Sequence, residues 1–300
     1  FEELREGEEE GRWNTTLEKY AYFARESLKR KEWKNFPRAL YYFYAQKISS
    51  EWGDDGAEKT FEIVKQETGD AEEPFFLFIN YVEPHSLYLP PKKYARKFLD
   101  TDLDEAYDYA SVSPTEFIGT EDEEKADVLE RLYDAELNYL DTKLERLFDH
   151  INASTDRENI FIFVGDHGEL FGKNGLWEHH GSLDEEVLKV PMIVHGNCRE
   201  GIEGMVELKE IYNYTLSIQR GNDYSFEKEA AFAEYDGFSC HMWKEAPETA
   251  IDRSATAVIT KDSQLLDIGG DRRVLKGKAG EKIHKGLTEF LEKSTLEIDF

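Results

Sequence analysis

Cysteine is scarce in this chain: its 300 residues include two, Cys198 and Cys240. Two cysteines at unrelated positions provide neither a disulfide framework nor the paired spacing of a zinc-binding motif. The chain also lacks any apolar run near the roughly 20 residues that a membrane helix needs, and it opens without a signal peptide. These absences exclude a disulfide-stapled scaffold, give this part of the chain no membrane segment and are compatible with a cytoplasmic location.

Positively charged residues are also few. The chain has 37 Lys and Arg against 64 Asp and Glu, a net charge of −27 and a pI near 4.7. Because such a chain is repelled by a polyanionic backbone, DNA and RNA are poor partners. Acidity spread along the whole chain is typical of proteins from salt-loving organisms, whose folds lose stability at low salt through self-repulsion. An ordinary acidic protein is the alternative, which the many lysines leave open.

Apolar residues are present in sufficient number for a sizeable core, since the chain is 40% hydrophobic and 13% aromatic. Helical spacing of apolar residues predicts a helical segment over residues 1–73 that packs on a core. Residues 74–221 alternate buried strands with helices and form the predicted α/β core. Residues 222–300 contain the predicted strands 230–235, 255–260 and 264–270 and a terminal helix over 281–294. The acidic stretch 100–124 is predicted to be a solvated surface loop.

The most informative motif is a run of five apolar residues, Ile160–Val164, followed by Gly165-Asp166-His167-Gly168-Glu169. The apolar run predicts a strand covered on both faces in a parallel sheet, and ligand sites lie beyond the carboxyl ends of such strands. The two glycines permit a sharp, crowded turn that directs the side chains of Asp166 and His167 at one point. A carboxylate and an imidazole side by side suit a divalent cation. The alternative is an Asp-His pair that caps the next helix.

Three further landmarks lie around this motif. A second apolar run, Pro74–Val82, predicts another buried strand and leads into Glu83-Pro84-His85 and then Pro90-Pro91. Residues 133–150 are predicted to form a helix that precedes the metal strand. After the motif come Glu178-His179-His180-Gly181, an acidic short helix and the strand Val190-Pro191-Met192-Ile193-Val194. With these four landmarks in order over about residues 74–220, the chain resembles the sulfatase family of the alkaline-phosphatase-like hydrolase superfamily.

The resemblance implies an α/β fold, an alkaline-phosphatase-like α/β/α sandwich with a small carboxyl-terminal antiparallel subdomain. It also implies one divalent metal ion held in part by Asp166 and His167. Calcium is the ion expected from the family, whereas the imidazole ligand favours Mn²⁺, Mg²⁺ or Zn²⁺ over an ion that prefers six to eight oxygen ligands.

By the same resemblance, His85 and His179 flank the substrate, contact its anionic oxygens and protonate the leaving group, which suits an imidazole titrating near neutral pH. His180 competes with His179 for this place. The spacing of 12 residues from His179 to Pro191 favours His179.

The nucleophile of the family is missing from these residues. Sulfatases carry Cys-x-Pro-x-Arg, oxidised to formylglycine, and phosphate-cleaving relatives use Ser or Thr. Cys198 is followed by Arg199-Glu200-Gly201, and Cys240 by His241-Met242-Trp243, so neither fits. The paired acidic residues that complete the metal site after a first strand are also missing. We therefore expect these residues to be the carboxyl-terminal part of a longer enzyme, inactive alone, whose preceding segment could carry a signal.

The sequence thus predicts a sulfuric ester hydrolase acting on a small-molecule or glycan sulfate ester. A phosphodiesterase or phosphonate monoesterase of the same superfamily is one alternative, and a non-catalytic metal-binding or interaction module is another. Glu169 is predicted either to orient His167 or to be an exposed carboxylate at a helix start. The histidines at positions 150, 195, 241 and 284 are predicted to be structural or surface residues.

Overall fold

The structure is a computed structural model that describes residues 56–70, 74–112, 114–155, 158–196, 204–226, 228–237, 247–278 and 280–294. The described residues belong to two compact units. The first comprises the residues up to Ser111 together with Arg131–Arg146, and the second comprises Val112–Glu130 with the residues from Leu147 onward. The helices predicted before residue 56 and the residues Cys198, Cys240 and His241 lie outside the described residues.

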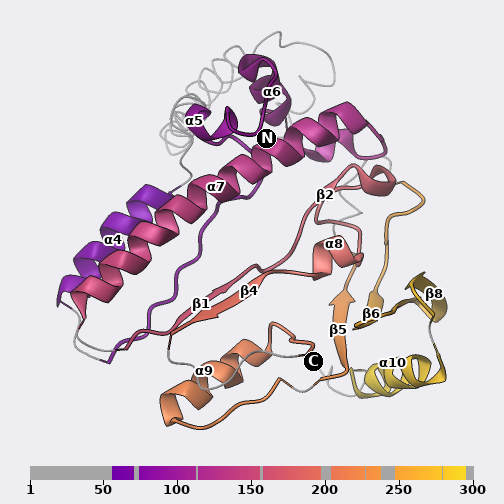
Figure 1. The fold of residues 1–300 in the computed structure, drawn as a ribbon. Helices are drawn as coiled ribbons and strands as arrows, with labels where there is room; N and C mark the ends of the chain where they lie inside the picture. The colour runs from indigo at the N-terminus through magenta and orange to yellow at the C-terminus, as the bar shows by residue number, and fades with distance from the viewer. Residues whose placement is uncertain are drawn as a thin grey trace, which may run out of the picture. The chain divides into compact units, whose positions relative to one another are not determined.

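The described chain contains short and long helices, two 3-10 turns and eight strands (Figure 1). The helices are α4 (Ala57–Asp70), α5 (Lys92–Ala95), α6 (Leu103–Ala110), α7 (Glu123–Ser154), α8 (Glu185–Leu188), α9 (Glu210–Arg220) and α10 (Glu281–Ser294), and the turns are η1 (Pro114–Phe117) and η2 (Lys173–Gly175). The strands are β1 (Phe161–Val164), β2 (Leu170–Phe171), β3 (Trp177–Glu178), β4 (Met192–His195), β5 (Ala230–Tyr235), β6 (Ala255–Thr260), β7 (Gln264–Ile268) and β8 (Asp271–Lys276).

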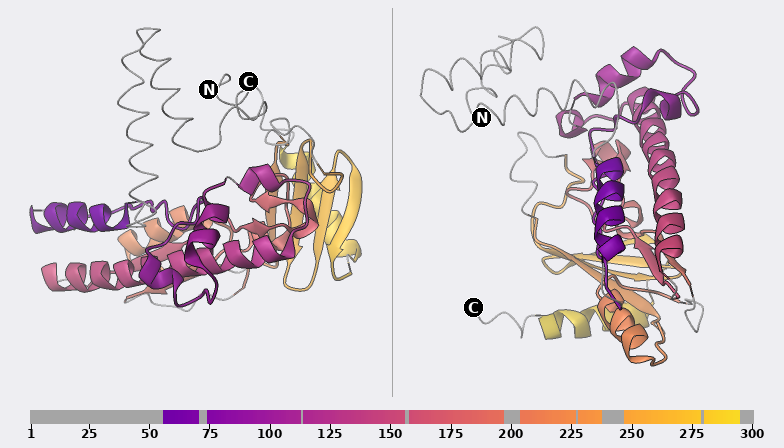
Figure 2. Two further views of the ribbon diagram at one scale, coloured as in Figure 1. Left: turned by 90° about the horizontal axis from the view of Figure 1, so that it is seen from above. Right: turned by 90° about the vertical axis from the view of Figure 1, so that its left-hand side faces the viewer.

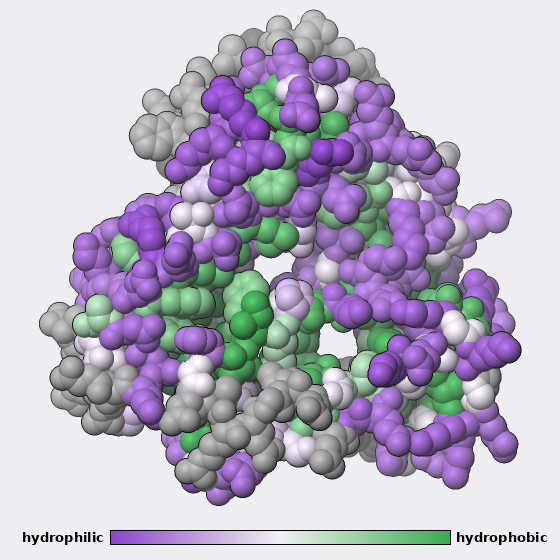
Figure 3. Space-filling model, viewed as in Figure 1, coloured by the Kyte–Doolittle hydropathy of each residue, from purple (hydrophilic) through white to green (hydrophobic). Residues whose placement is uncertain are grey.

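The helices predicted at 133–150 and 281–294 and the three carboxyl-terminal strands are confirmed by α7, α10, β5, β6 and β7. Hydrophilic side chains cover most of the face shown in Figure 3, as expected for a chain with 34% charged residues. Among the described helices, none is both long and apolar enough to cross a bilayer.

In the first unit, α4 runs alongside α7 (Figures 1 and 2). Glu58 of α4 accepts hydrogen bonds from Lys143 and, at 2.9 Å, from Arg146 Nη1. The apolar core of this unit includes Tyr94 of α5 and Tyr139 of α7, whose rings meet edge to face with centroids 5.2 Å apart. Packing of this kind, more than helix propensity, holds the helices in place.

The apolar segment Phe75–Val82 differs from its prediction as a buried strand. It is extended, but it pairs with no strand among the described residues. Phe76 and Phe78 are 76% and 79% exposed. A strand becomes buried only when neighbouring strands satisfy its backbone groups and other elements cover its faces. No described element does this, so the prediction is wrong for the described part of the chain.

The acidic stretch 100–124 also differs from its prediction as a solvated loop. Residues 103–110 form α6, which begins where the Asp102 carboxylate accepts the amide hydrogen of Asp104 at 2.8 Å. Tyr107 and Ala110 of α6 are buried, and the Tyr107 hydroxyl donates to the carbonyl of Pro90. The alternation of Ala and Tyr with acidic residues therefore marks an amphipathic helix rather than a loop.

In the second unit, β1 pairs with β4, with Phe161 opposite His195 and Val164 opposite Met192. This pairing is antiparallel, and the residues of β1 are half-buried. The prediction of a parallel strand covered on both faces is therefore wrong for this pair. The chain leaves β1, makes an excursion over residues 165–191 and returns beside the same strand in the opposite direction, which gives an antiparallel ladder.

The carboxyl-terminal part of the second unit is a four-stranded antiparallel sheet in the order β5-β6-β7-β8, with α10 beside it (Figure 2). Val258 and Leu265 of the sheet pack against Leu287 of α10. Ala257 and Leu266 belong to a separate cluster that also contains Leu183. Sequence analysis missed β8 because most of its side chains are exposed, and it therefore lacks an alternating pattern.

The loop after β1 lies directly against α8. The amide of Gly168 donates to the carbonyl of Val187 at 2.7 Å, and a Cβ at Gly168 would overlap the carbonyl oxygen of Glu186. A side chain cannot fit between two backbones at this separation. The glycine therefore allows the Asp-His loop to dock on α8.

The core between the sheet and α10 can be tested at Leu287, which is 0% exposed. We expect Leu287→Ala to lower the free energy of unfolding by about 2–5 kcal/mol, because the truncation leaves a cavity in a packed core. Leu275 in β8, which is 41% exposed, is the matched control. For Leu275→Ala we expect a change within about 0.5 kcal/mol. Equal losses in urea unfolding curves would contradict this packing.

The docking of the Asp-His loop can be tested at Gly168. We expect Gly168→Ala to lower the free energy of unfolding by about 1–3 kcal/mol, because the added methyl group forces two backbones apart. The control is Gly286→Ala in α10, where a Cβ meets nothing within 4 Å. There alanine should stabilise the helix by up to about 1 kcal/mol. Thermal unfolding of both variants provides the comparison, and a neutral Gly168→Ala would refute the close approach.

Candidate functional site

A short hairpin follows the Asp-His loop. β2 pairs with β3, with Leu170 opposite Glu178 and Phe171 opposite Trp177. The turn between them uses positive φ at Gly172 (79°) and Asn174 (56°), the residue types that adopt this conformation most readily. The fully buried Trp177 holds the hairpin through its ring Nε1, which donates to the carbonyl of Thr120 at 3.1 Å.

Asp166 and His167 together offer an oxygen and a nitrogen to a cation. Asp166 Oδ2 lies 3.8 Å from His167 Nε2, and the Asp166 side chain is 85% exposed. His167 Nδ1 lies 2.9 Å from the carbonyl oxygen of Gly168, which can only accept, so Nδ1 carries the hydrogen. In the neutral ring the lone pair is then on Nε2, the nitrogen near the carboxylate. This tautomer is the one that a metal ligand requires at Nε2.

His179 lies against His167, as the hairpin brings the two rings together. Their centroids are 3.8 Å apart and the ring planes differ by 30°. His179 Nδ1 is 3.5 Å from Glu169 Oε1, and both side chains are largely buried. Glu169 raises the pKa of His179 above its usual value, because the attraction of the carboxylate outweighs the cost of burying the charged ring.

His180 has a different carboxylate neighbour. Its ring centroid is 4.3 Å from that of His179, and its Nε2 lies 3.9 Å from Glu178 Oε2. Glu178 is buried and has a φ of 59°, an uncommon conformation for a residue other than glycine. The two adjacent histidines therefore face two different buried carboxylates.

The carboxyl-terminal subdomain holds the loop that follows these histidines. The carbonyl of Gly181 accepts from the amide of Ile251 at 2.8 Å, and the carbonyl of Leu183 accepts from Gln264 Nε2 at 2.5 Å. Gln264 is 2% exposed, so this bond is shielded from water. Sequence analysis did not identify Gln264, since a glutamine within a strand pattern gives no signal of such a contact.

Glu169 is not where it was predicted to be. It follows Gly168 directly into β2, its side chain is 7% exposed, and its charged neighbour is His179. The prediction of an exposed carboxylate at a helix start is wrong, because the chain enters a strand after the motif and not a helix. That Glu169 orients His167 stays a prediction. The hairpin brings Glu169 close to His179, which directly follows β3.

His85 belongs to the first unit, whereas Asp166, His167, His179 and His180 belong to the second. Two buried carboxylates fix the backbone around it: Glu83 Oε1 accepts from the amide of Ala57 at 2.9 Å, and Glu136 Oε1 from the amide of Leu89 at 2.6 Å. His85 Nδ1 lies 2.7 Å from the carbonyl oxygen of Ser86, so this nitrogen donates. Its convergence with the other histidines stays a prediction.

The remaining described histidines lie apart from this cluster. His150 is in the last turns of α7, His195 ends β4 opposite Phe161, and the carbonyl of His284 in α10 accepts from Arg272. These positions agree with a structural role.

The donor set fits half of a metal site. Asp166 and His167 supply a carboxylate oxygen and an imidazole nitrogen, which suit Mn²⁺, Mg²⁺ or Zn²⁺. Within the described ranges, no group of three or more His, Cys, Asp or Glu side chains is arranged to hold a metal ion. Further ligands would have to come from elsewhere.

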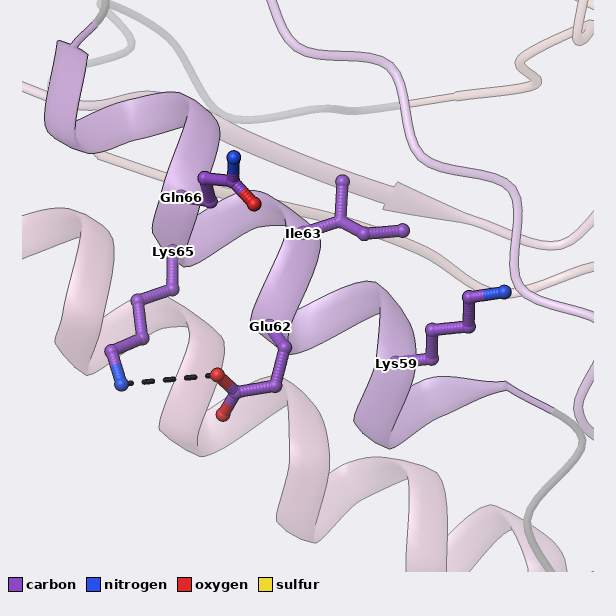
Figure 4. A pocket seen from close by; sticks show the side chains of 5 residues that line it. All are labelled: Lys59, Glu62, Ile63, Lys65 and Gln66. Atoms are coloured by element: carbon purple, nitrogen blue, oxygen red, sulfur yellow. Dashed lines mark ion pairs between the residues drawn. The ribbon is translucent and has the colours of Figure 1, made fainter.

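A separate hollow on α4 offers no comparable chemistry. It is lined by Lys59, Glu62, Ile63, Lys65 and Gln66, and Lys65 forms an ion pair with Glu62 at 3.8 Å. Figure 4 shows these side chains leaving one helix in different directions. Because they do not converge on a point, the histidine cluster of the second unit is the stronger candidate site.

Comparisons with known proteins identify the family of this chain. The chain is 29% identical to an arylsulfatase of Clostridium perfringens over 160 residues, which is 47% of this chain and 33% of the relative. It is 23% identical to a choline-sulfatase of Rhizobium meliloti over 160 residues, 46% of this chain and 30% of the relative. The chain thus matches about a third of the length of these relatives.

The fold matches solved structures as well. A phosphonate monoester hydrolase from Silicibacter pomeroyi aligns with a TM-score of 0.54 and 17% identity, covering 81% of this chain and 59% of the other. This likeness shows the alkaline-phosphatase-like fold that the sequence predicted. A family model described as Sulfatase matches residues 13–201, which include the Asp-His loop, the hairpin and His85. The chain therefore belongs to the Sulfatase family.

Proposed function

We propose that this chain is the carboxyl-terminal part of a metal-dependent hydrolase that cleaves a sulfate ester. The observation that supports the proposal is the cluster of Asp166, His167 and His179. In it, a carboxylate lies near one imidazole ring, and a second imidazole ring stacks on the first. Residues 74–221 would form the α/β core that carries this cluster, with a helical segment over 1–73 packed on it. Residues 222–300 would form the antiparallel subdomain that holds the site loop.

Each residue has a defined part in this proposal. Asp166 and His167 would hold the cation, which supplies positive charge to the equatorial oxygens of the sulfuryl group. His179 would deliver a proton to the leaving oxygen, because Glu169 beside it raises the pKa of the ring and favours the protonated form. His85 would contact the anionic oxygens of the substrate. His180 would line the same site beside His179.

The nucleophile would come from residues outside this sequence. Neither Cys198 nor Cys240 is followed by the proline and arginine of the sulfatase motif. We therefore expect these 300 residues alone to turn over no sulfate ester. A full-length protein with Cys-x-Pro-x-Arg before this segment would carry both the nucleophile and the remaining metal ligands.

A phosphonate monoesterase activity is the second candidate, supported by the likeness in fold to the Silicibacter pomeroyi enzyme. Sulfate and phosphonate monoesters present similar tetrahedral anions, so the described histidines serve either. Hydrolysis of 4-nitrophenyl sulfate and of 4-nitrophenyl phenylphosphonate by the full-length protein separates the two. Faster turnover of the sulfate supports a sulfatase, and faster turnover of the phosphonate supports the second candidate.

Metal binding can be tested at Asp166 in the full-length protein. We expect Asp166→Ala to abolish binding of Mn²⁺ in isothermal titration calorimetry, and to abolish hydrolysis, because the cation loses a charged ligand. Asp252→Ala removes an exposed carboxylate of the same unit and should leave affinity unchanged. Unchanged affinity in Asp166→Ala would remove this residue from the ligand set. Metal binding without turnover of either ester would instead indicate a non-catalytic module.

A further inference from the structure

We propose that Glu169 is the positioning residue for His179: it holds Nδ1 of the ring, so that Nε2 is the nitrogen presented to the substrate. This inference rests on the proposed function, since it names the residue that orients the proton donor. The juxtaposition that carries it is the 3.5 Å approach of Glu169 Oε1 to His179 Nδ1 between two largely buried side chains.

The backbone fixes both members of this pair. Leu170 is opposite Glu178 in the hairpin, and Glu169 and His179 directly adjoin this pair, one before β2 and the other after β3. Just before Glu169, the amide of Gly168 donates a hydrogen bond to the carbonyl of Val187 in α8. Shortly after His179, the carbonyl of Gly181 accepts a hydrogen bond from the amide of Ile251. The approach of the two side chains therefore follows from anchored backbone and does not depend on a mobile surface contact.

The chemistry of the two groups then selects one arrangement of the ring. An ionised carboxylate only accepts hydrogen bonds, so its approach to Nδ1 favours the ring form that carries a hydrogen on this nitrogen. In the neutral ring, Nε2 then has the lone pair, and in the charged ring Nε2 has the second hydrogen. Either way Nε2 lies on the far side of the ring from Glu169. His167, stacked at 3.8 Å, blocks one face of His179 and hinders the ring from turning over.

The neighbouring pair, Glu178 and His180, has the opposite arrangement, because here the carboxylate lies near the other ring nitrogen. Glu178 lies near Nε2 of His180, at 3.9 Å, and not near Nδ1. The distal nitrogen of His180 is thus directed at a buried carboxylate of the protein. Of the two adjacent histidines, His179 is the one whose carboxylate neighbour lies at Nδ1, on the side of the ring away from Nε2. This arrangement favours His179 over His180 for the part that the sequence left open between them.

The first test reads the ring directly and needs no turnover. The full-length protein, labelled with ¹⁵N-histidine, is studied by long-range ¹H–¹⁵N correlation at about pH 9, where unperturbed histidine is neutral; a His179→Gln variant identifies the His179 signals. We expect the Nδ1–H tautomer in the wild type. Glu169→Gln, whose amide oxygen still accepts, should retain it, and Glu169→Ala should lose it. An Nε2–H tautomer at His179 in the wild type would overturn the proposal.

The second test uses steady-state hydrolysis of 4-nitrophenyl sulfate by the full-length protein. We expect Glu169→Ala to lower kcat by about 10–100-fold with little change in KM, as for other residues that orient a reacting group. Glu169→Gln should recover most of the loss, which a purely structural defect would not allow. Glu186→Gln, which removes a surface partner of Lys173, is the control and should retain full activity.

The results distinguish a failure of the positioning inference from a failure of the proposed function. A kcat loss in Glu178→Gln with none in Glu169→Ala would show that His180 is the oriented ring and would overturn the inference. If the wild type turns over no sulfate ester, the proposed function fails, while the tautomer measurement still decides whether Glu169 holds Nδ1. A normal kcat in Glu169→Ala with an active wild type would contradict the positioning role alone.

Discussion

The contact between the Gly168 loop and α8 is the constraint on which the rest of the site depends. The amide of Gly168 reaches the carbonyl of Val187 at 2.7 Å, with no space for a side chain. This contact sets the direction in which the chain leaves β1, and so where Asp166 and His167 point. It also places Glu169 at the start of the hairpin. The absence of a side chain at Gly168 thus affects both the Asp-His pair and the carboxylate that lies near His179.

The described residues of the carboxyl-terminal subdomain support the site through backbone contacts. Its β6–β7 region supplies Gln264, and the segment before β6 supplies Ile251, which hold the backbone at Leu183 and Gly181. Lys276 of β8 pairs with Glu185 at the start of α8. These bonds tie α8 and the histidine loop to one sheet. They therefore restrain the loop that carries His179, as a precisely positioned side chain requires.

Sequence reasoning succeeded where the information was local. The crowding at Gly168 and the helices predicted at 133–150 and 281–294 each involve a few neighbouring residues, and the structure has them. It failed where the structure depends on pairing between residues that are far apart in the sequence. Phe75–Val82 has the composition of a buried strand, but burial depends on partners that the described residues do not supply. The partner of Glu169 depends on hairpin register, and the Gly172 and Asn174 turn was the available signal for it.

The central claim is that Asp166 and His167 hold a catalytic cation beside His179. A crystal structure of the full-length protein grown with Mn²⁺, with anomalous differences measured at the manganese edge, tests it most directly. The account predicts one strong peak about 2.2 Å from Asp166 Oδ2 and from His167 Nε2, a typical ligand distance. A manganese peak bound elsewhere, with these two side chains unligated, would contradict it.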